Sequence, residues 1–355
     1  MAFSPSIGKI YGIEVELHWT FILLLLFTLF ISLYVFLLII LLFICVLLHE
    51  LAHSITSIRN GVRVRKIILL PIGGASIIDN VKIPPKVEFN IAIAGPLMSL
   101  FLGGVFGMLA IMSPPGIILQ TMQIMFEMNV LLGVFNLLPA FPMDGGRVFR
   151  SYLQKKRDFY SSTIITVKVS KYLMGVIVLG TFAFLAFGTS YSFSYREFVT
   201  LWDLIIVMFL YSGAQAEEES AKIKKETEGL HLGNAVSRHF MLVKPGLRLD
   251  ELYSMLVKRK EHIIITKLGS KYAYVELYRR GKQANAETVR EMAKPIPSMQ
   301  ARLPLADALS LMESSEANII AVLDGRKFIG IATINSIQAI ISLHLLSKAR
   351  QNAKK

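Results

Sequence analysis

Three ionisable side chains, His49, Glu50 and His53, lie within an otherwise apolar stretch of the chain. Since His49 and His53 are four residues apart, both imidazoles project from one face of a helix, a single turn apart, and can bind one zinc ion. Glu50 lies beside the open position of such a metal, where a carboxylate can act as a general base. The spacing is that of a zinc protease helix.

A catalytic zinc site needs a third protein ligand, for which two carboxylates are candidates. Glu127 and Asp144 cannot share one site, because 17 residues of helix would separate them by about 25 Å. Asp144 is predicted to lie at the depth of the two histidines, and Pro142 with the following glycines indicates that a helix restarts there. An aspartate at a helix N-terminus is stabilised as an anion, which favours Asp144 as the third ligand.

The elements that position these residues are membrane helices. The chain has 355 residues, of which 54% are hydrophobic, and its mean hydropathy of +0.54 is typical of a membrane protein. Six spans are predicted, at residues 17–33, 35–58, 88–112, 117–138, 164–188 and 198–216. The first two need a reversal near Ile31 to Val35, because a single helix over residues 17–58 would be about 60 Å long.

The basic residues predict the orientation of these spans. Fourteen of the 15 Lys and Arg residues in the segment 1–216 fall on one predicted side, and only Arg196 falls on the other. This asymmetry predicts a multi-pass protein of the cell membrane with both termini in the cytosol. These basic residues lie at the ends of apolar runs, where they indicate membrane topology. The net charge of +13 therefore does not indicate nucleic-acid binding.

Between the second and third spans, residues 66–78 form a β-branched run broken by Pro71, Gly73 and Gly74. The run is too short to span a bilayer, so it is predicted to be a membrane-dipping β-hairpin. A transmembrane substrate must unwind before a peptide bond is accessible, and the hairpin offers a strand edge on which it can bind. Pro71, Gly73 and Gly74 are therefore candidate substrate-binding residues.

Other polar residues leave alternatives open. His18 is either an interfacial residue or a neighbour of the active site. Glu127, together with Gln120, Gln123 and Asn129, either lines a water path or is a paired structural carboxylate.

The segments His49-Glu-Leu-Ala-His53 and Asn136-Leu-Leu-Pro-Ala-Phe-Pro-Met-Asp144-Gly resemble the site-2 protease family of intramembrane zinc metalloproteases. The resemblance covers most of residues 1–216 and implies that His49, His53 and Asp144 hold one zinc ion and that Glu50 is the general base. It also implies that Asn136 helps to hold the substrate or its oxyanion.

After the last span, a charged linker at 217–229 leads to a repeated pattern at 230–346. Apolar positions from Leu249 to Ile264 return at an offset of 56 residues, from Leu305 to Ile320, which predicts a helix followed by a strand, twice. The repeat resembles a tandem pair of CBS domains, mainly through residues 321–333. That resemblance implies either a site for ATP, ADP or AMP, whose contact residues the sequence does not identify, or a ligand-free module that forms a homodimer.

These features predict a polytopic α-helical membrane domain joined to a soluble α/β domain. The expected function is hydrolysis of peptide bonds within or near transmembrane segments of membrane-protein substrates. The alternative is a CBS-regulated transporter or channel with a metal site. It is disfavoured because the polar residues concentrate on two spans instead of following a pathway through several.

Overall fold

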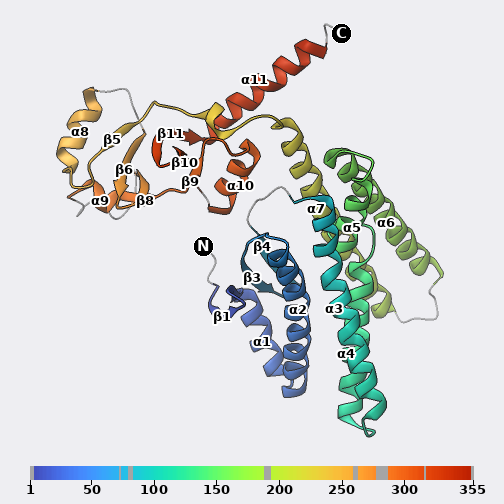
Figure 1. Ribbon diagram of the computed structural model, residues 1–355. Helices are drawn as coiled ribbons and strands as arrows, with labels where there is room; N and C mark the ends of the chain where they lie inside the picture. Colours follow the sequence, from blue (N-terminus) through green and yellow to red (C-terminus); the bar gives the residue numbers. More distant parts are fainter. Residues whose placement is uncertain are drawn as a thin grey trace. The chain divides into compact units, whose positions relative to one another are not determined.

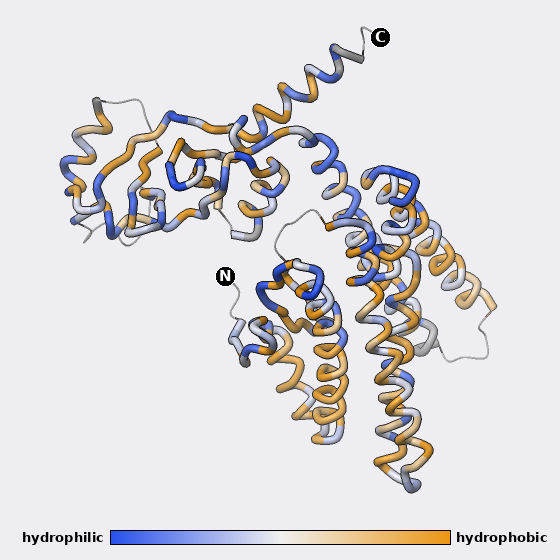
Figure 2. Tube along the Cα trace, viewed as in Figure 1, coloured by the Kyte–Doolittle hydropathy of each residue, from blue (hydrophilic) through white to orange (hydrophobic). Residues whose placement is uncertain are grey.

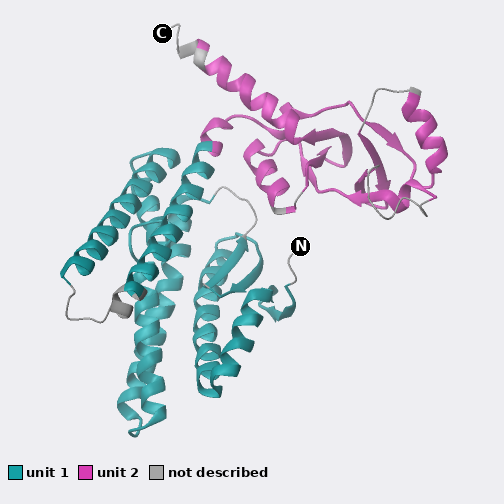
Figure 3. Cartoon of the chain, turned by 180° about the vertical axis from the view of Figure 1, so that it is seen from behind, with its two compact units in different colours: residues 1–222 teal, residues 223–355 magenta. Residues whose placement is uncertain are grey.

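The computed structural model describes residues 4–71, 73–78, 83–187, 193–258, 263–276, 287–315 and 317–352. The chain forms two compact units, Met1–Lys222 and Ile223–Lys355 (Figure 3). The boundary between the units lies within the charged segment 217–229, and it falls inside one continuous helix, α7 (Phe193–Glu226).

The first unit begins its helical part with α1 (Trp19–Ile31) and α2 (Leu33–Arg59) (Figure 1). The chain reverses at Ser32, whose hydroxyl accepts a hydrogen bond from the backbone N–H of Tyr34 and caps α2. This reversal lies within the segment from Ile31 to Val35, where the sequence predicts it. Five described helices are long and apolar enough to cross a membrane, whereas α1 has only 13 residues. The protein is therefore a multi-pass membrane protein, and the count of six spans stays a prediction.

A four-stranded sheet lies beside these two helices. Its order is β1 (Ser6–Ile10), β2 (Ile13–Leu17), β3 (Val64–Leu70) and β4 (Gly73–Ile78), with β2 and β3 parallel and the other pairs antiparallel. The strands β1 and β2 were not expected from the sequence, although residues 13–17 alternate apolar and acidic side chains. The strand β4 is at the edge of the sheet and packs against α2.

The remaining helices of the first unit are α3 (Pro85–Met112), α4 (Ile117–Asn136), α5 (Asp144–Leu153), α6 (Phe159–Phe187) and α7. Most of their residues are hydrophobic (Figure 2). Glycines allow α3 and α4 to pack closely, because a side chain on Gly103 would collide with Val130 and one on Gly133 with Leu100.

The second unit contains two α/β repeats, each with an apolar core. In the first, α8 (Leu249–Lys258) precedes β6 (Ile264–Leu268), and in the second, α10 (Leu305–Ser315) precedes β10 (Ile319–Asp324), which confirms the predicted helix–strand repeat. The first sheet has the order β5-β6-β7-β8 and the second β11-β10-β9. The other elements are η1 (Leu232–Ala235), β5 (Met241–Val243), β7 (Lys271–Val275), α9 (Val289–Met292), β8 (Ala293–Pro295), β9 (Ser298–Gln300), β11 (Lys327–Thr333) and α11 (Ile334–Asn352).

Candidate metal centre and active site

The two histidines of the zinc-binding pattern lie one turn apart on the inner face of α2. Their Nε2 atoms are 3.1 Å apart, and their ring planes are inclined at 78°. His49 is almost fully buried, with 5% of its surface exposed, so it is not a solvated surface residue.

The third group is Asp144, the first residue of α5. The segment after α4 contains Pro142, and the chain resumes a helix at Asp144, where the free N–H groups of the first turn favour an anion. Its Oδ2 atom lies 3.3 Å from Nε2 of His49 and 3.1 Å from Nε2 of His53. Glu127 is exposed on α4 and belongs to no cluster of potential metal ligands among the described residues.

Two groups on α3 orient the imidazoles. Nδ1 of His53 donates to the backbone carbonyl of Ile91 at 2.7 Å, which leaves the lone pair of its Nε2 free for a metal. Nδ1 of His49 is 2.8 Å from the hydroxyl oxygen of Ser99, which is fully buried. Neither partner can be identified from the sequence, because one is a backbone carbonyl and the other is a serine on a different helix.

A glycine on the same helix makes room for the site. A Cβ atom at Gly95 would lie 2.1 Å from Nε2 of His53 and 2.6 Å from Nε2 of His49. Any larger residue would therefore occupy the space into which both metal-binding nitrogens point. The residues next to Gly95 in the sequence do not indicate this role, because the histidines that it faces are more than 40 positions away.

The three atoms have the spacing that a zinc ion requires. Tetrahedral zinc with bonds of about 2.0–2.1 Å holds its ligand atoms about 3.3 Å apart. The observed separations are 3.1, 3.1 and 3.3 Å. Two neutral imidazoles and one carboxylate are also the donor types that zinc prefers. The residues present therefore fit a zinc ion.

Glu50 lies beside this cluster and is held by β4. The hydroxyl of Ser76 donates to Oε2 of Glu50 at 2.7 Å. Two residues earlier on the same face of the strand, a Cβ atom at Gly74 would lie 2.4 Å from Cγ of Glu50. The helix α2 and the strand β4 are therefore in direct contact at the carboxylate of Glu50.

The other predicted residues take separate places. Asn136 ends α4, is partly buried, and donates from its side chain to the carbonyl of Leu132. Pro71 forms the turn between β3 and β4, and Gly73 begins β4 with a φ of 141°. His18 caps α1, because its Nδ1 accepts from the backbone N–H of Thr20.

Residues 37–115 and 114–182 match Peptidase family M50. The zinc metalloprotease MJ0392 of Methanocaldococcus jannaschii is 34% identical over 269 residues, which cover 73% of this chain and 74% of the relative. The chain belongs to peptidase family M50. As a member of this family it is a zinc metalloprotease, and the alternative of a transporter or channel is not favoured.

Two solved structures are also similar to parts of this M50 chain. One is the Site-2 Protease from Methanocaldococcus jannaschii, with 38% sequence identity, 61% of this chain covered, 95% of that chain covered and a TM-score of 0.44. The other is the CBS domain of the bacterial CNNM/CorC family Mg²⁺ transporter in complex with ATP. It has 12% sequence identity, 36% of this chain covered, 97% of that chain covered and a TM-score of 0.30.

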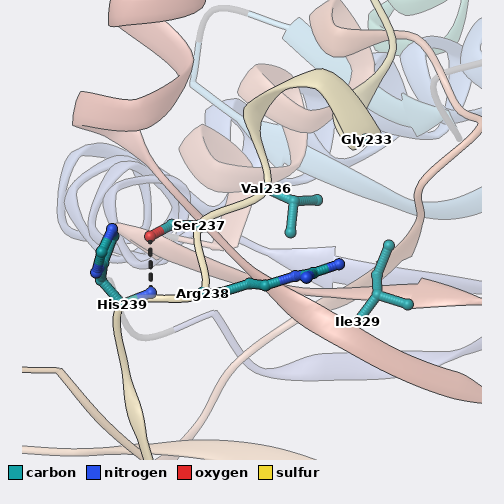
Figure 4. A pocket seen from close by; sticks show the side chains of 6 residues that line it. All are labelled: Gly233, Val236, Ser237, Arg238, His239 and Ile329. Atoms are coloured by element: carbon teal, nitrogen blue, oxygen red, sulfur yellow. Dashed lines mark hydrogen bonds between the residues drawn. The ribbon is translucent and has the colours of Figure 1, made fainter.

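The second unit of the M50 chain has a cavity of about 580 Å³ (Figure 4). One lining residue comes from η1, four come from the segment that joins η1 to β5, and one comes from β11: Gly233, then Val236, Ser237, Arg238 and His239, and Ile329. The side chain of Arg238 extends along the cavity, and the backbone N–H of His239 donates to the hydroxyl of Ser237 at 3.2 Å. Arg238 makes no ion pair within the part of the chain that the structure describes.

Proposed function

We propose that this zinc metalloprotease hydrolyses peptide bonds within or near transmembrane segments of membrane proteins, and that it does so inside the bilayer. The observation that carries this proposal is the convergence of His49, His53 and Asp144 beside Glu50, on or next to helices long and apolar enough to span a membrane. Ionisable groups within such helices are costly, so they are retained where they bind or react.

His49, His53 and Asp144 would hold one zinc ion per chain, and Glu50 would be the general base. Zinc held there would polarise a peptide carbonyl and make a water molecule more acidic. Glu50 is placed to accept a proton from the attacking water and to return it to the leaving amine. The charges of one zinc ion, Asp144 and Glu50 sum to zero, and transfer of the proton to Glu50 keeps that sum, so no net charge develops inside the apolar site.

The strand β4 is the proposed binding edge for substrate. It is the last strand in the sheet order, and the face that carries Gly74 and Ser76 contacts Glu50. A substrate segment that unwinds and pairs with β4 would bring its peptide bonds next to the base. Pro71 and Gly73 shape the turn that begins this strand. Asn136, at the end of α4, would supply an amide for the substrate or its oxyanion.

Both termini are proposed to be cytosolic, and the hairpin of β3 and β4 is proposed to dip into the membrane. One support is the distribution of basic residues, of which 14 of 15 lie on one predicted side. The other is the number of apolar helices, which is six if the short helix α1 also crosses the membrane. Permeation-limited labelling of single cysteines near Pro114 and near Lys155 tests this. The first should react from outside and the second only after lysis, and the reverse result would refute the orientation.

For the second unit we propose a CBS-type pair that binds ATP, ADP or AMP and forms a homodimer. The support is the helix–strand repeat and the cavity at Arg238, whose guanidinium can bind a phosphate. A nucleotide would change the rate of cleavage only if it binds two arrangements of the protein with different affinity. Dimerisation without a ligand is the competing outcome.

One set of variants of the full chain tests the catalytic assignment. His49→Ala, His53→Ala and Asp144→Asn should each lose zinc, because two remaining ligands form an incomplete site, while Glu127→Gln should keep it. Glu50→Gln should keep zinc and lose about 10²–10⁴-fold in cleavage of a single-span substrate. Full cleavage by Glu50→Gln would refute the mechanism, and loss of zinc in Glu127→Gln but not in Asp144→Asn would refute the third ligand.

A further inference from the structure

Arg150 is a buried cation that the proposed reaction does not use. It lies on α5, six residues or about 9 Å along the helix from Asp144, and its side chain is only 7% exposed. A guanidinium cannot lose its proton to avoid burial, so it must find anionic partners. Burial works to lower the pKa of Arg150, but the carboxylates of Glu217 and Glu88 raise it above its ordinary value.

The partners of Arg150 come from two other helices. Its Nε donates to Oε1 of Glu88 on α3 at 3.0 Å, and its Nη2 contacts the same oxygen. Its Nη1 donates to Oε2 of Glu217 on α7 at 2.7 Å. The rings of Phe141 and Phe159 lie 5.0 and 4.8 Å from its Cζ. The guanidinium of Arg150 is planar and its N–H groups point in fixed directions. It can therefore bind both carboxylates at once only when α3, α5 and α7 keep one relative arrangement.

The same face of α7 also contacts the segment that leads into Asp144. Leu210 and Ala214 are buried in a cluster with Phe141 and Met143. A Cβ atom at Gly213 would lie 2.6 Å from Pro142, two residues before Asp144. The positions 210, 213, 214 and 217 follow helical spacing, so one stripe of α7 holds α5 and its entry segment from both sides of the aspartate.

We infer that Arg150 is a positioning residue, which sets the place of Asp144 in the metal centre by tying α5 to Glu88 on α3 and to Glu217 on α7. This inference rests on the proposed role of Asp144 as the third zinc ligand. The helix α7 continues without a break to Glu226 and passes from the first compact unit into the second. A displacement of α7 would therefore reach a metal ligand through Glu217 and Gly213.

The test is Glu217→Gln in the full-length protein, because this change removes one carboxylate and leaves Arg150 paired with Glu88. We expect zinc release to a chelator to be about 10–100-fold faster and kcat to fall by a similar factor, as for other groups that orient metal ligands, with KM within about twofold. The visible spectrum of the cobalt-substituted protein should change, since Asp144 shifts relative to the two histidines. Gly213→Ala should change the same quantities in the same direction.

Glu218→Gln is the matched control. Glu218 is the next residue of α7, carries the same charge and pairs with Lys171 at the surface, where its side chain is 38% exposed. Zinc release and the cobalt spectrum should match those of the wild type, because surface ion pairs contribute little. Gly180→Ala, at an open position on α6, serves the same purpose for Gly213→Ala.

The outcomes separate this inference from the proposed function. If the wild-type protein holds no zinc or cleaves no substrate, the proposed function is wrong. If the wild type does both, but Glu217→Gln retains zinc as Glu218→Gln does, Arg150 does not position Asp144. A lower melting temperature in Glu217→Gln, with unchanged zinc release and an unchanged cobalt spectrum, also overturns the inference, because the ion pairs would then be structural only.

Discussion

The two compact units bury polar side chains to very different extents. Of the 14 buried polar or charged residues among those that the structure describes, 12 lie in the first unit, and only Thr227 and Thr266 lie in the second. Burying a polar group costs free energy unless it is paired, and more so where lipid replaces water. In the first unit the partners of His49 and Arg150 come from other helices. The buried polar residues of the first unit therefore include the groups proposed to position the chemistry, while the second unit is built on apolar cores.

This difference leads to an expectation about mutations. In the first unit, the addition of one methyl group near the metal centre should remove zinc or activity while the fold remains. In the second unit, a change at the cavity should alter only the response to a ligand.

The largest effect is expected for Gly95→Ala. The added Cβ would lie 2.1 Å from Nε2 of His53, so the imidazoles must move and the chain should lose zinc and, with it, all cleavage. Zinc content by mass spectrometry of the purified protein measures this. Gly104→Ala, on the same helix with nothing within 4 Å of the added atom, is the control. Equal zinc content in both variants would contradict the close approach of Gly95 to the imidazoles of His49 and His53.

Gly74→Ala should affect the base and spare the ligands. Its Cβ would lie 2.4 Å from Cγ of Glu50 and would displace the carboxylate, so we expect cleavage to fall about 10²–10⁴-fold, the usual contribution of a general base. Zinc content should remain near one per chain. Loss of zinc together with activity, as in Gly95→Ala, would mean that β4 supports the whole site and not Glu50 alone.

Ser99→Ala should have a smaller effect. It removes the partner of Nδ1 of His49 but no metal ligand, so zinc affinity should fall about 10–100-fold. Competition with a zinc chelator gives the affinity. Ser113→Ala, at the exposed end of the same helix, should bind zinc as the wild type does. If both serine variants have the same affinity, Ser99 has no part in orienting His49.

The sequence predicted those parts of the structure that follow from local spacing. His49 and His53 share a helix face, and the helix–strand repeat near Leu249 and Leu305 follows from periodic apolar residues. The structure confirms that the two histidines are adjacent on one helix and that the helix–strand pattern occurs twice. Asp144 could be chosen over Glu127 because helix length converts residue number into depth.

The remaining features depend on contacts between elements that are distant in the sequence. Ser99 and the carbonyl of Ile91 reach the histidines from another helix, and neither has a distinctive sequence pattern. The strands β1 and β2 precede the first apolar run, and the pairing of β2 with β3 depends on residues about 50 positions away. Arg150 is one of the basic residues that indicate topology, and its burial depends on Glu88 and Glu217 on two other helices.

The smallest effect, confined to the second unit, is expected for Arg238→Gln. Arg238 extends along the cavity of that unit, and a guanidinium that binds a phosphate contributes through a charge-assisted hydrogen bond of about 1.5–3 kcal/mol. Its loss should weaken binding of ATP, ADP or AMP about tenfold or more. Calorimetry on the full-length protein measures the affinity, and the cleavage rate with and without nucleotide measures the response. Zinc content should not change, because the metal ligands belong to the first unit.

Arg248→Gln is the control for this variant, because it removes the same charge from the same unit at an exposed residue that pairs with its neighbour Asp250. It should bind nucleotide as the wild type does, since Arg248 does not line the cavity. Equal weakening in both arginine variants would show that general charge, and not the cavity, attracts the nucleotide. If no heat of binding is observed even for the wild type, the contrast between the units becomes sharper, because the second unit would then act through dimerisation alone.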